Sequence, residues 1–321
     1  MQSRLPNTQM SSPSASPAPE PHPIFNTTYT LHTLPPLFAF PALTATSLKP
    51  HSRRLLQVFR GENLRGVALP PTHSEQAQLS RAGKLLSCVW APLPPYLPRD
   101  GGDDGDDDDD DDNEHGSGDR LIGVKIDVVY ENASYTALLV SDGQASTAGG
   151  FTRLPLLLSR LPGPLRQQLL DYLAVNFDTL PLPLELPQTL LRQGLDGFMA
   201  ESRGGGGKDV VLTFAGKGEG LRRITITVDA DDVRQFWRRG AGKGGGGFLK
   251  ALGEHLESVM GLRIGEVELV KVATGGFVLA VEGKAKFFEG RGSAMAAMVL
   301  EQAGKGMSTT TDQLIDHSAA Q

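Results

Sequence analysis

The most constraining feature of the chain is a long stretch of alternating apolar and polar residues, "LIGVKIDVVYENASYTALLVSDG", at residues 121–143. A polar turn at Glu131 to Ser134 divides it into two alternating halves. The apolar residues that share one side are Ile122, Val124, Ile126, Val128 and Tyr130 in the first half, and Tyr135, Ala137 and Leu139 in the second. This pattern predicts an antiparallel hairpin with one apolar face. A hairpin of this length needs further elements to cover that face.

Amphipathic helices that can cover the hairpin follow it along the chain. Residues 163–177 and 186–200 carry apolar stripes at helical spacing, and so do residues 229–240 and 248–260. The stripes consist of Leu165, Leu169, Leu170, Leu173 and Phe177; Leu190, Leu191, Leu195 and Phe198; Val233, Phe236 and Trp237; and Phe248, Leu249, Leu252, Leu256 and Val259. Two further helices are expected at residues 48–61 and 293–304.

Short β-branched and aromatic runs predict strands at residues 63–69, 84–90, 209–214 and 222–229, and two or three more between residues 265 and 290. In the run at 222–229, the alternation places Ile224, Ile226 and Val228 inside and Arg223, Thr225 and Thr227 outside. Strands joined by hairpins, with helices laid on them, indicate an α+β fold with a largely antiparallel sheet.

The chain has one expected folded domain, residues 23–303, with several interruptions. Residues 1–22 are rich in Ser and Pro and should be disordered, because they have little apolar surface to bury. An acidic disordered insert is expected at 99–119, Gly-rich loops at 203–208 and 240–247, and a flexible tail at 304–321. The insert holds more negative charge than the whole chain's net charge of −6. The remainder is therefore mildly basic.

Composition excludes several classes of protein. Cys88 is the single cysteine, so an internal disulfide cannot form, and it lies in an apolar run that predicts a buried, inert thiol. We see no apolar run long enough for a membrane span and no signal-peptide pattern, which indicates a reducing compartment.

Catalytic and cofactor-binding patterns are also missing from the sequence. The glycine-rich runs around Lys243 and Lys305 lack the spacing of a phosphate-binding loop, and the seven histidines are scattered without metal-ligand spacing. Asp231 and Asp232 resemble a carboxylate pair, but their position at an expected helix start explains them. We therefore expect no enzyme, no cofactor, no metal and no small-molecule substrate.

A strand near the N-terminus is followed by a proline-rich exit. In "IFNTTYTLHTLPPLF", residues 24–38, Thr27, Tyr29 and Leu31 alternate with more polar residues until Pro35 and Pro36 end the run. This stretch resembles the N-terminal signature of the centromere protein L family, which includes fungal inner-kinetochore members. Three later motifs resemble that family in the same order, namely "RLPLLLSRLPGPL", "ITITVDADDVRQFW" and "LVKVATGGFVLAVEGKAKFF".

The resemblance covers residues 24–303 and implies a function. It implies a structural, non-enzymatic subunit of the constitutive centromere-associated network, located in the nucleus at the centromere and kinetochore. The subunit would pair with a centromere protein N relative, largely through its C-terminal half, and would help to connect centromeric chromatin to the kinetochore during chromosome segregation. Contact with centromeric DNA and formation of a homodimer are further expectations from the family. The acidic insert and the glycine expansions depart from the family pattern.

The expected partner surface lies on the closing strands, because both faces of that region are apolar. Its residues are Leu269, Val272, Phe277, Leu279, Val281, Phe287 and Phe288. An alternative interpretation is that these side chains lie beneath the protein's own helices.

The alternative function is autonomous DNA binding through a basic face of the sheet. The cations that would follow a phosphate backbone are Arg222, Arg223, Arg238, Arg239, Lys271, Lys284 and Lys286. They form one face only if their elements pack side by side, and ordinary solvated charge is the competing interpretation.

Overall fold

The structure is a computed structural model that describes residues 21–61, 81–94, 96, 121–143, 147–216, 223–242 and 247–318. The acidic insert expected at 99–119 lies outside the described residues. So do the strand expected at 63–69, nearly all of the expected N-terminal tail and the middle of the second Gly-rich loop.

The described elements alternate between strands and helices along the whole chain. The first half consists of β1 (Thr28–Thr33), β2 (Leu37–Phe38), α1 (Ala45–Phe59), β3 (Leu85–Pro92), β4 (Ile122–Tyr130), β5 (Ser134–Ser141), β6 (Thr147–Ala148), β7 (Phe151–Thr152), β8 (Leu156–Arg160) and α3 (Gly163–Phe177). The second half consists of β9 (Leu182–Pro183), α4 (Gln188–Glu201), η1 (Gly205–Gly207), β10 (Val210–Ala215), β11 (Arg223–Val228), α5 (Ala230–Gly242), α6 (Gly247–Met260), β12 (Glu268–Ala273), β13 (Phe277–Ala280), β14 (Lys284–Phe287) and α7 (Ser293–Ser318).

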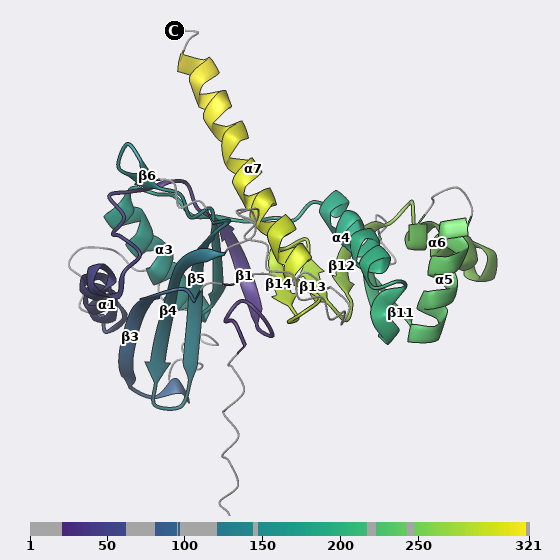
Figure 1. Cartoon of the computed structure of the whole chain (residues 1–321), viewed down its shortest axis with the longest axis horizontal. Helices are drawn as coiled ribbons and strands as arrows, with labels where there is room; N and C mark the ends of the chain where they lie inside the picture. Colours follow the sequence, from purple (N-terminus) through teal and green to yellow (C-terminus); the bar gives the residue numbers. More distant parts are fainter. Residues whose placement is uncertain are drawn as a thin grey trace, which may run out of the picture.

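A single large sheet runs through an elongated molecule (Figure 1). Its eleven strands follow the order β11-β10-β12-β13-β14-β1-β8-β5-β4-β3, with β9 paired to β1 beside this path. The strand pairs of this sheet are antiparallel, and a small second sheet joins β2, β7 and β6. The expected α+β fold with a largely antiparallel sheet is confirmed.

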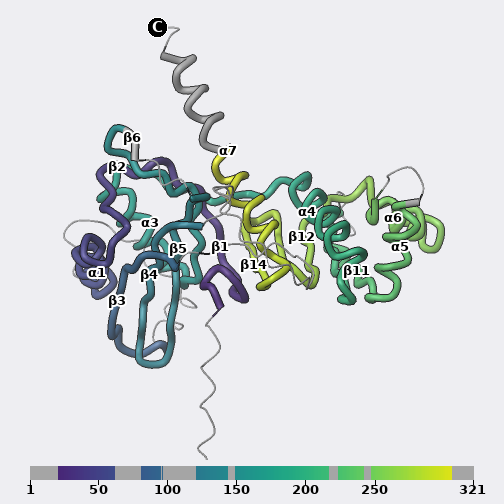
Figure 2. Tube along the Cα trace, in the orientation of Figure 1, coloured from purple at the N-terminus to yellow at the C-terminus, as the bar shows by residue number. Residues whose placement is uncertain are grey.

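The first strand of the chain occupies the middle of the large sheet. Figure 2 shows β1, in purple, between the teal β5 and the yellow-green β14. On one side Tyr29 is aligned with Ala285 of β14, and on the other Leu31 is aligned with Leu158 of β8. The N-terminal stretch thus joins strands from the two halves of the chain.

The sequence-predicted hairpin is confirmed in β4 and β5. Val124 lies opposite Leu139 and Ile126 opposite Ala137, so the apolar residues share one face as their alternation requires. Helices α1 and α3 cover this face, and together they enclose a core that includes Trp90 of β3 and Phe177 of α3.

A second core lies on the opposite face of the sheet. It is formed by apolar side chains of α4, α6 and α7 with those of β10, β12, β13 and β14. Central strands β5 and β8 contribute to both cores, because successive side chains point to opposite faces: Leu158 belongs to one core and Leu157 to the other.

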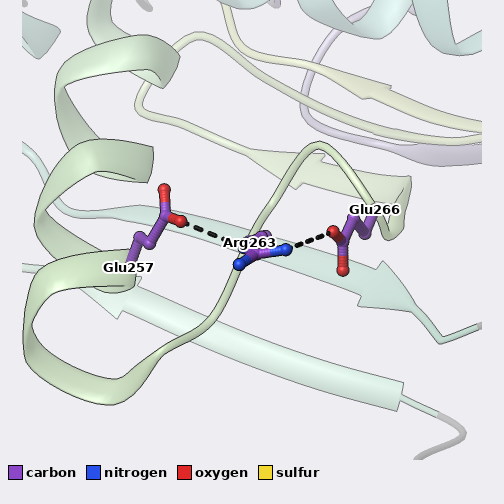
Figure 3. A network of polar contacts seen from close by, with 3 residues as sticks. All are labelled: Glu257, Arg263 and Glu266. Atoms are coloured by element: carbon purple, nitrogen blue, oxygen red, sulfur yellow. Dashed lines mark hydrogen bonds and ion pairs between the residues drawn. The ribbon is translucent and has the colours of Figure 1, made fainter.

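The link between α6 and β12 carries a surface ion-pair network (Figure 3). The Arg263 guanidinium donates from Nε to Glu257 Oε1 and from Nη1 to Glu266 Oε1, each at 3.0 Å. All three side chains are largely exposed, so we assign the network a minor role in stability.

Three local details differ from the sequence-based expectations. Strand β8 falls within a leucine-rich motif for which no strand was predicted. Val259 is 66% exposed, although it was expected in the buried stripe of α6. Helix α7 continues through residues 304–318, where the sequence predicted a flexible tail.

The structure predicts a large effect for truncation of one closing-strand phenylalanine. Phe277 is fully buried, and its ring lies edge to face with that of Phe198, 5.8 Å away. Phe277→Ala should lower the free energy of unfolding by about 3–5 kcal/mol, because it removes a large buried ring and leaves a cavity. Urea unfolding measures the effect. Val278→Ala on the opposite face of β13 is the matched control, and an equal loss in both variants would contradict this packing.

Candidate functional site

The two halves of the sheet are covered on opposite faces. Helices α4, α6 and α7 pack on one face of the C-terminal half, whereas α1 and α3 pack on the other face of the N-terminal half. The face of β10–β14 that points away from α4, α6 and α7 therefore carries side chains that are mostly exposed or half-buried. We call it the open face. Its residues are Val211, Thr213, Ala215, Arg223, Thr225, Thr227, Glu268, Lys271, Ala273, Val278, Ala280, Lys284 and Lys286, continued on β1 by Thr28 and Thr30.

Four sequence-predicted DNA-binding residues come together on the open face. The strand registers align one row across five strands, from Thr213 through Lys271 and Ala280 to Lys284 and Thr30. Lys271 and Lys284 are therefore two strand spacings apart, about 10 Å. Lys286 follows two residues after Lys284 on β14, and Arg223 lies on β11.

The residues between these cations are small or carry hydroxyl groups. Ala280 separates the two lysines of the row, so no bulky side chain stands between them. On the neighbouring strands, the hydroxyl oxygens of Thr213 and Thr225 lie 3.4 Å apart. Guanidinium, ammonium and hydroxyl groups are among the side-chain groups that contact nucleic-acid phosphates. The alternation of Arg223, Thr225 and Thr227 had predicted their outward orientation.

Carboxylates accompany the cations but do not outnumber them on the described part of this face. Glu282, in the β13–β14 turn, has its Oε1 3.4 Å from Lys284 Nζ, and both side chains are more than half exposed. Such exposed ion pairs contribute little to stability. Glu268 lies opposite Ala215 on the same face, and Lys286 Nζ lies 4.7 Å from the ring centroid of Phe288. With four cations and two carboxylates, the face is net positive.

The remaining sequence-predicted DNA contacts do not join this face. Arg238 and Arg239 lie on α5, which packs through Val233 and Phe236 against the helical side of the molecule, and the Arg239 guanidinium lies 5.8 Å from the ring centroid of Phe236. Arg222 lies outside the described residues. The expected single basic face is therefore corrected to the four sheet cations, because α5 is on the covered side of the sheet.

Most of the sequence-predicted partner residues lie inside the protein's own core. Leu269, Val272, Phe277, Leu279 and Phe287 are each at most 1% exposed. Their places on the strands direct them toward α4, α6 and α7. The alternative interpretation, burial beneath the protein's own helices, thus holds for these five residues. Val281 and Phe288 are half-buried.

The sheet ends in two edges, β11 and β3. In the described region β11 pairs with β10 alone, and β3 pairs with β4 alone. An edge strand presents unpaired backbone N–H and C=O groups to any chain that can add a strand. The β11 edge borders the open face through Arg223, Thr225 and Thr227.

Titratable groups do not converge on a reaction centre in the parts of the chain that the structure describes. The ranges contain no cluster of three or more His, Cys, Asp or Glu suited to a metal ion. Burial raises the pKa of the Cys88 thiol to about 12, which makes it unreactive at neutral pH. None of the described helices combines the length and apolar content that a membrane span requires.

His32 is the most perturbed histidine of the described chain. It lies on β1 and is 4% exposed, and its Nδ1 has no hydrogen-bond partner within the described residues. Burial, reinforced by the nearby charge of Arg166, lowers the pKa of His32 to about 4. The imidazole is therefore neutral at physiological pH.

The comparison with protein families decides the identity. A family model described as centromere protein L matches residues 23–319, nearly the whole chain. The chain belongs to the centromere protein L family. No curated protein matches the chain.

Membership of the centromere protein L family fixes the cellular context of the open face. The chain is a nuclear protein of the centromere and kinetochore that serves chromosome segregation, as the four sequence motifs indicated. The family consists of structural kinetochore components and is not an enzyme family. A centromere protein L site is therefore to be sought among surfaces that contact other macromolecules.

The lowered pKa of His32 predicts a specific loss of stability in acid. The unfolded chain takes up a proton on this imidazole near pH 6.5, whereas the folded chain does so only near pH 4. The contribution of neutral His32 is thus complete above pH about 6.5 and is lost between there and pH about 4, amounting to about 3 kcal/mol. Unfolding by urea across this range measures the loss.

His32→Gln provides the control for this prediction. His22 and His51 also have pKa values lowered by burial and are present in both proteins, so the difference in pH dependence isolates His32. The variant should lose less stability between pH 6.5 and pH 4 than the wild type. Parallel stability curves would contradict the assignment.

Proposed function

We propose that the chain is a structural subunit of the inner kinetochore that pairs with a centromere protein N relative and helps to connect centromeric chromatin to the kinetochore. The observation that carries this proposal is the combination of a net positive sheet face, which no described helix covers, with an edge strand beside it that pairs on one side only in the described region. Membership of the centromere protein L family supports the setting. The chain works by presenting surfaces rather than by catalysis.

The partner attaches at the β11 edge. This edge lies in the C-terminal half, and an added strand from the partner would satisfy its outward backbone groups and extend the sheet. Side chains on the exposed side of β11 are polar, whereas Ile224 and Ile226 on the other side are half-buried against the core. The side chains of an added strand would extend the open face on one side of the sheet and the apolar core on the other. A second copy of the chain is the alternative occupant of the same edge.

Centromeric DNA lies against the open face. Lys284 and Lys286 are two residues apart on β14, and Lys271 lies two strands away on the same face. Thr213 is aligned with Lys271, and Thr30 and Thr28 are aligned with the two lysines of β14. A duplex presents dense negative charge on a convex surface, which a broad basic platform can follow without reading bases. Autonomous DNA binding, without the partner, is the second candidate function and rests on the same four cations.

Proline substitution tests the β11 edge. Thr225→Pro and Ile226→Pro form a matched pair, because successive backbone N–H groups of a strand point to opposite edges. One substitution removes a hydrogen bond to β10, and the other removes an outward N–H. The variant that keeps its hydrogen bond to β10 should be the more stable of the two in urea, and it is therefore the one that lacks the outward N–H. This variant should bind the co-expressed centromere protein N relative at least tenfold more weakly than the wild type does.

Hydrogen exchange on the wild-type complex gives an independent measurement. The relative should protect amides of β11 while leaving those of the other edge strand, β3, unchanged. Protection confined to β3, or full binding by both proline variants, would overturn the edge assignment. If the chain alone dimerised with increasing concentration, and the variant without the outward N–H did not, the edge would be assigned to a second copy of the chain.

The salt dependence of DNA binding tests the open face. Lys271→Ala combined with Lys286→Ala should reduce the slope of log K against log salt by about 2, since each lost phosphate contact removes about one counterion. Fluorescence anisotropy with a labelled duplex measures this, for the chain alone and for its complex with the partner. Arg238→Ala combined with Arg239→Ala on α5 is the matched control. An unchanged slope in the sheet variant would remove the open face from DNA binding.

A further inference from the structure

Two hollows lie on the side of β1 that faces α3. The first, about 520 Å³, is lined by Thr28 and Thr30 of β1, by Pro162 at the start of α3 and by Lys284 of β14. The second, about 340 Å³, is lined by His32 of β1, by one flank of α3 and by the segment from Leu180 to Pro183. Both lie where the covered half of this face meets the open half.

The two hollows lie next to each other along β1. Thr28, Thr30 and His32 alternate along β1 and therefore share a face, spaced about 6.8 Å from each to the next. On α3, the backbone N–H of Arg166 donates to Pro162 O at 2.9 Å, so one helical turn connects the lining of the first hollow to that of the second. We call this feature the β1 groove. The first hollow is bounded by β1, β8, the β4–β5 turn and β14, and the second by β1, α3 and the segment that holds β9.

Positive charge dominates the β1 groove. Arg81, Arg160 and Lys284 line the first hollow, and Arg166 lines the second. Asp171, at the far end, is the one acidic residue in the described lining of the two hollows, and its Oδ1 accepts a hydrogen bond from Gln167 Nε2 at 2.9 Å. A ligand with negative charge on one side is the complementary occupant.

The groove also has apolar walls that the described chain leaves uncovered. Leu170 and Ala174 of α3 face Leu180 and Pro181 across the second hollow, and Leu180 is 66% exposed. His32 also lines this hollow, but its unpartnered Nδ1 is buried and is not accessible to a ligand there. The groove therefore combines cations with apolar walls.

We propose that the β1 groove binds an extended acidic peptide segment, supplied by another protein, that carries at least one apolar side chain. The carboxylates pair with Lys284 and Arg166, and the apolar side chain lies against Leu170 and Leu180. The span from Thr28 to His32, about 13 Å, matches about four residues of extended chain. A DNA duplex fits less well, because it is convex and offers no aliphatic group to the recessed apolar walls.

This site is separate from the β11 edge and goes beyond the proposed pairing. Lys284 is shared, since it lies at the border between the groove and the open face. A peptide in the groove would neutralise Lys284, while Lys271 and Lys286 stay available to DNA. Variants can therefore distinguish the two surfaces.

Selection from a random peptide library tests the proposal without assuming the partner's sequence. The full chain is immobilised, a library of displayed random peptides is the probe, and the double variant Arg166→Glu, Lys284→Glu serves for counter-selection. Enriched peptides should carry acidic residues next to an aliphatic or aromatic residue. By fluorescence polarisation, each single charge reversal should weaken the best peptide at least tenfold, because each breaks a charge-assisted contact.

Matched controls separate the groove from general charge effects. Lys271→Glu on the open face and Lys250→Glu on α6 change the net charge equally and line neither hollow, so they should leave peptide affinity within twofold. Leu180→Ala, at an exposed position, should also weaken binding. Thermal unfolding monitors the fold of each variant, since the substituted residues are exposed or half-buried.

Several outcomes would overturn the proposal. The enriched peptides could lack acidic residues, or the wild type could enrich none beyond those that bind the double variant. Lys271→Glu could also lower peptide affinity as much as the charge reversals in the groove do. Each of these results would contradict the proposal. If Arg166→Glu weakened the binding of duplex DNA as much as the combined substitution of Lys271 and Lys286 does, the groove would belong to the DNA-binding surface. If it abolished self-association, the occupant would be a second copy. Loss of pairing at β11 with peptide binding intact would leave this proposal standing and contradict only the edge assignment.

Discussion

The pairing of β1 with β14 and β8 is the interaction on which the rest of the structure depends. A strand from residues 28–33 is inserted between one that ends near residue 287 and one that begins near residue 156. Outside the β1 pairs, no strand pair of the described chain links β10–β14 to β8 and β3–β5. The alternation of Tyr29 and Leu31 with threonines and His32 suits this position, because one face packs under α7 and the other borders α3.

Helices on opposite faces create both surfaces proposed to function. Helices α4, α6 and α7 cover one face of the C-terminal half, whereas α1 and α3 cover the other face of the N-terminal half. The helical cover therefore changes face near β1, and we call this place the step. Beyond the step lies the open face with its lysines, and at the step lies the β1 groove. A kinetochore component benefits from this arrangement because several surfaces on one rigid sheet can hold different macromolecules in fixed relative positions.

Local pattern predicted most elements and the family, but it misplaced several functional residues. The hairpin of β4 and β5, the helices after it and the outward orientation of Arg223, Thr225 and Thr227 follow from periodicity that short segments carry in themselves. The closing strands were harder, because an apolar side chain such as Phe277 is equally suited to a core and to a partner surface. The continuous leucine run of β8 also gave no alternation, since both of its faces are buried.

The sequence by itself determined the α+β class, the family, the mildly basic character of the chain outside its acidic run, and the identity of the sheet cations. Only the tertiary structure decided which cations share a face, because strand order places residues as distant in the sequence as Arg223 and Lys284 on the same side of the sheet, whereas Arg238 and Arg239 lie on α5 at the covered side. It also decided that β11 and β3 are the edges of the sheet among the described strands, and that two hollows lie beside β1. These properties arise from contacts between segments far apart in the chain, and local periodicity carries no information about them.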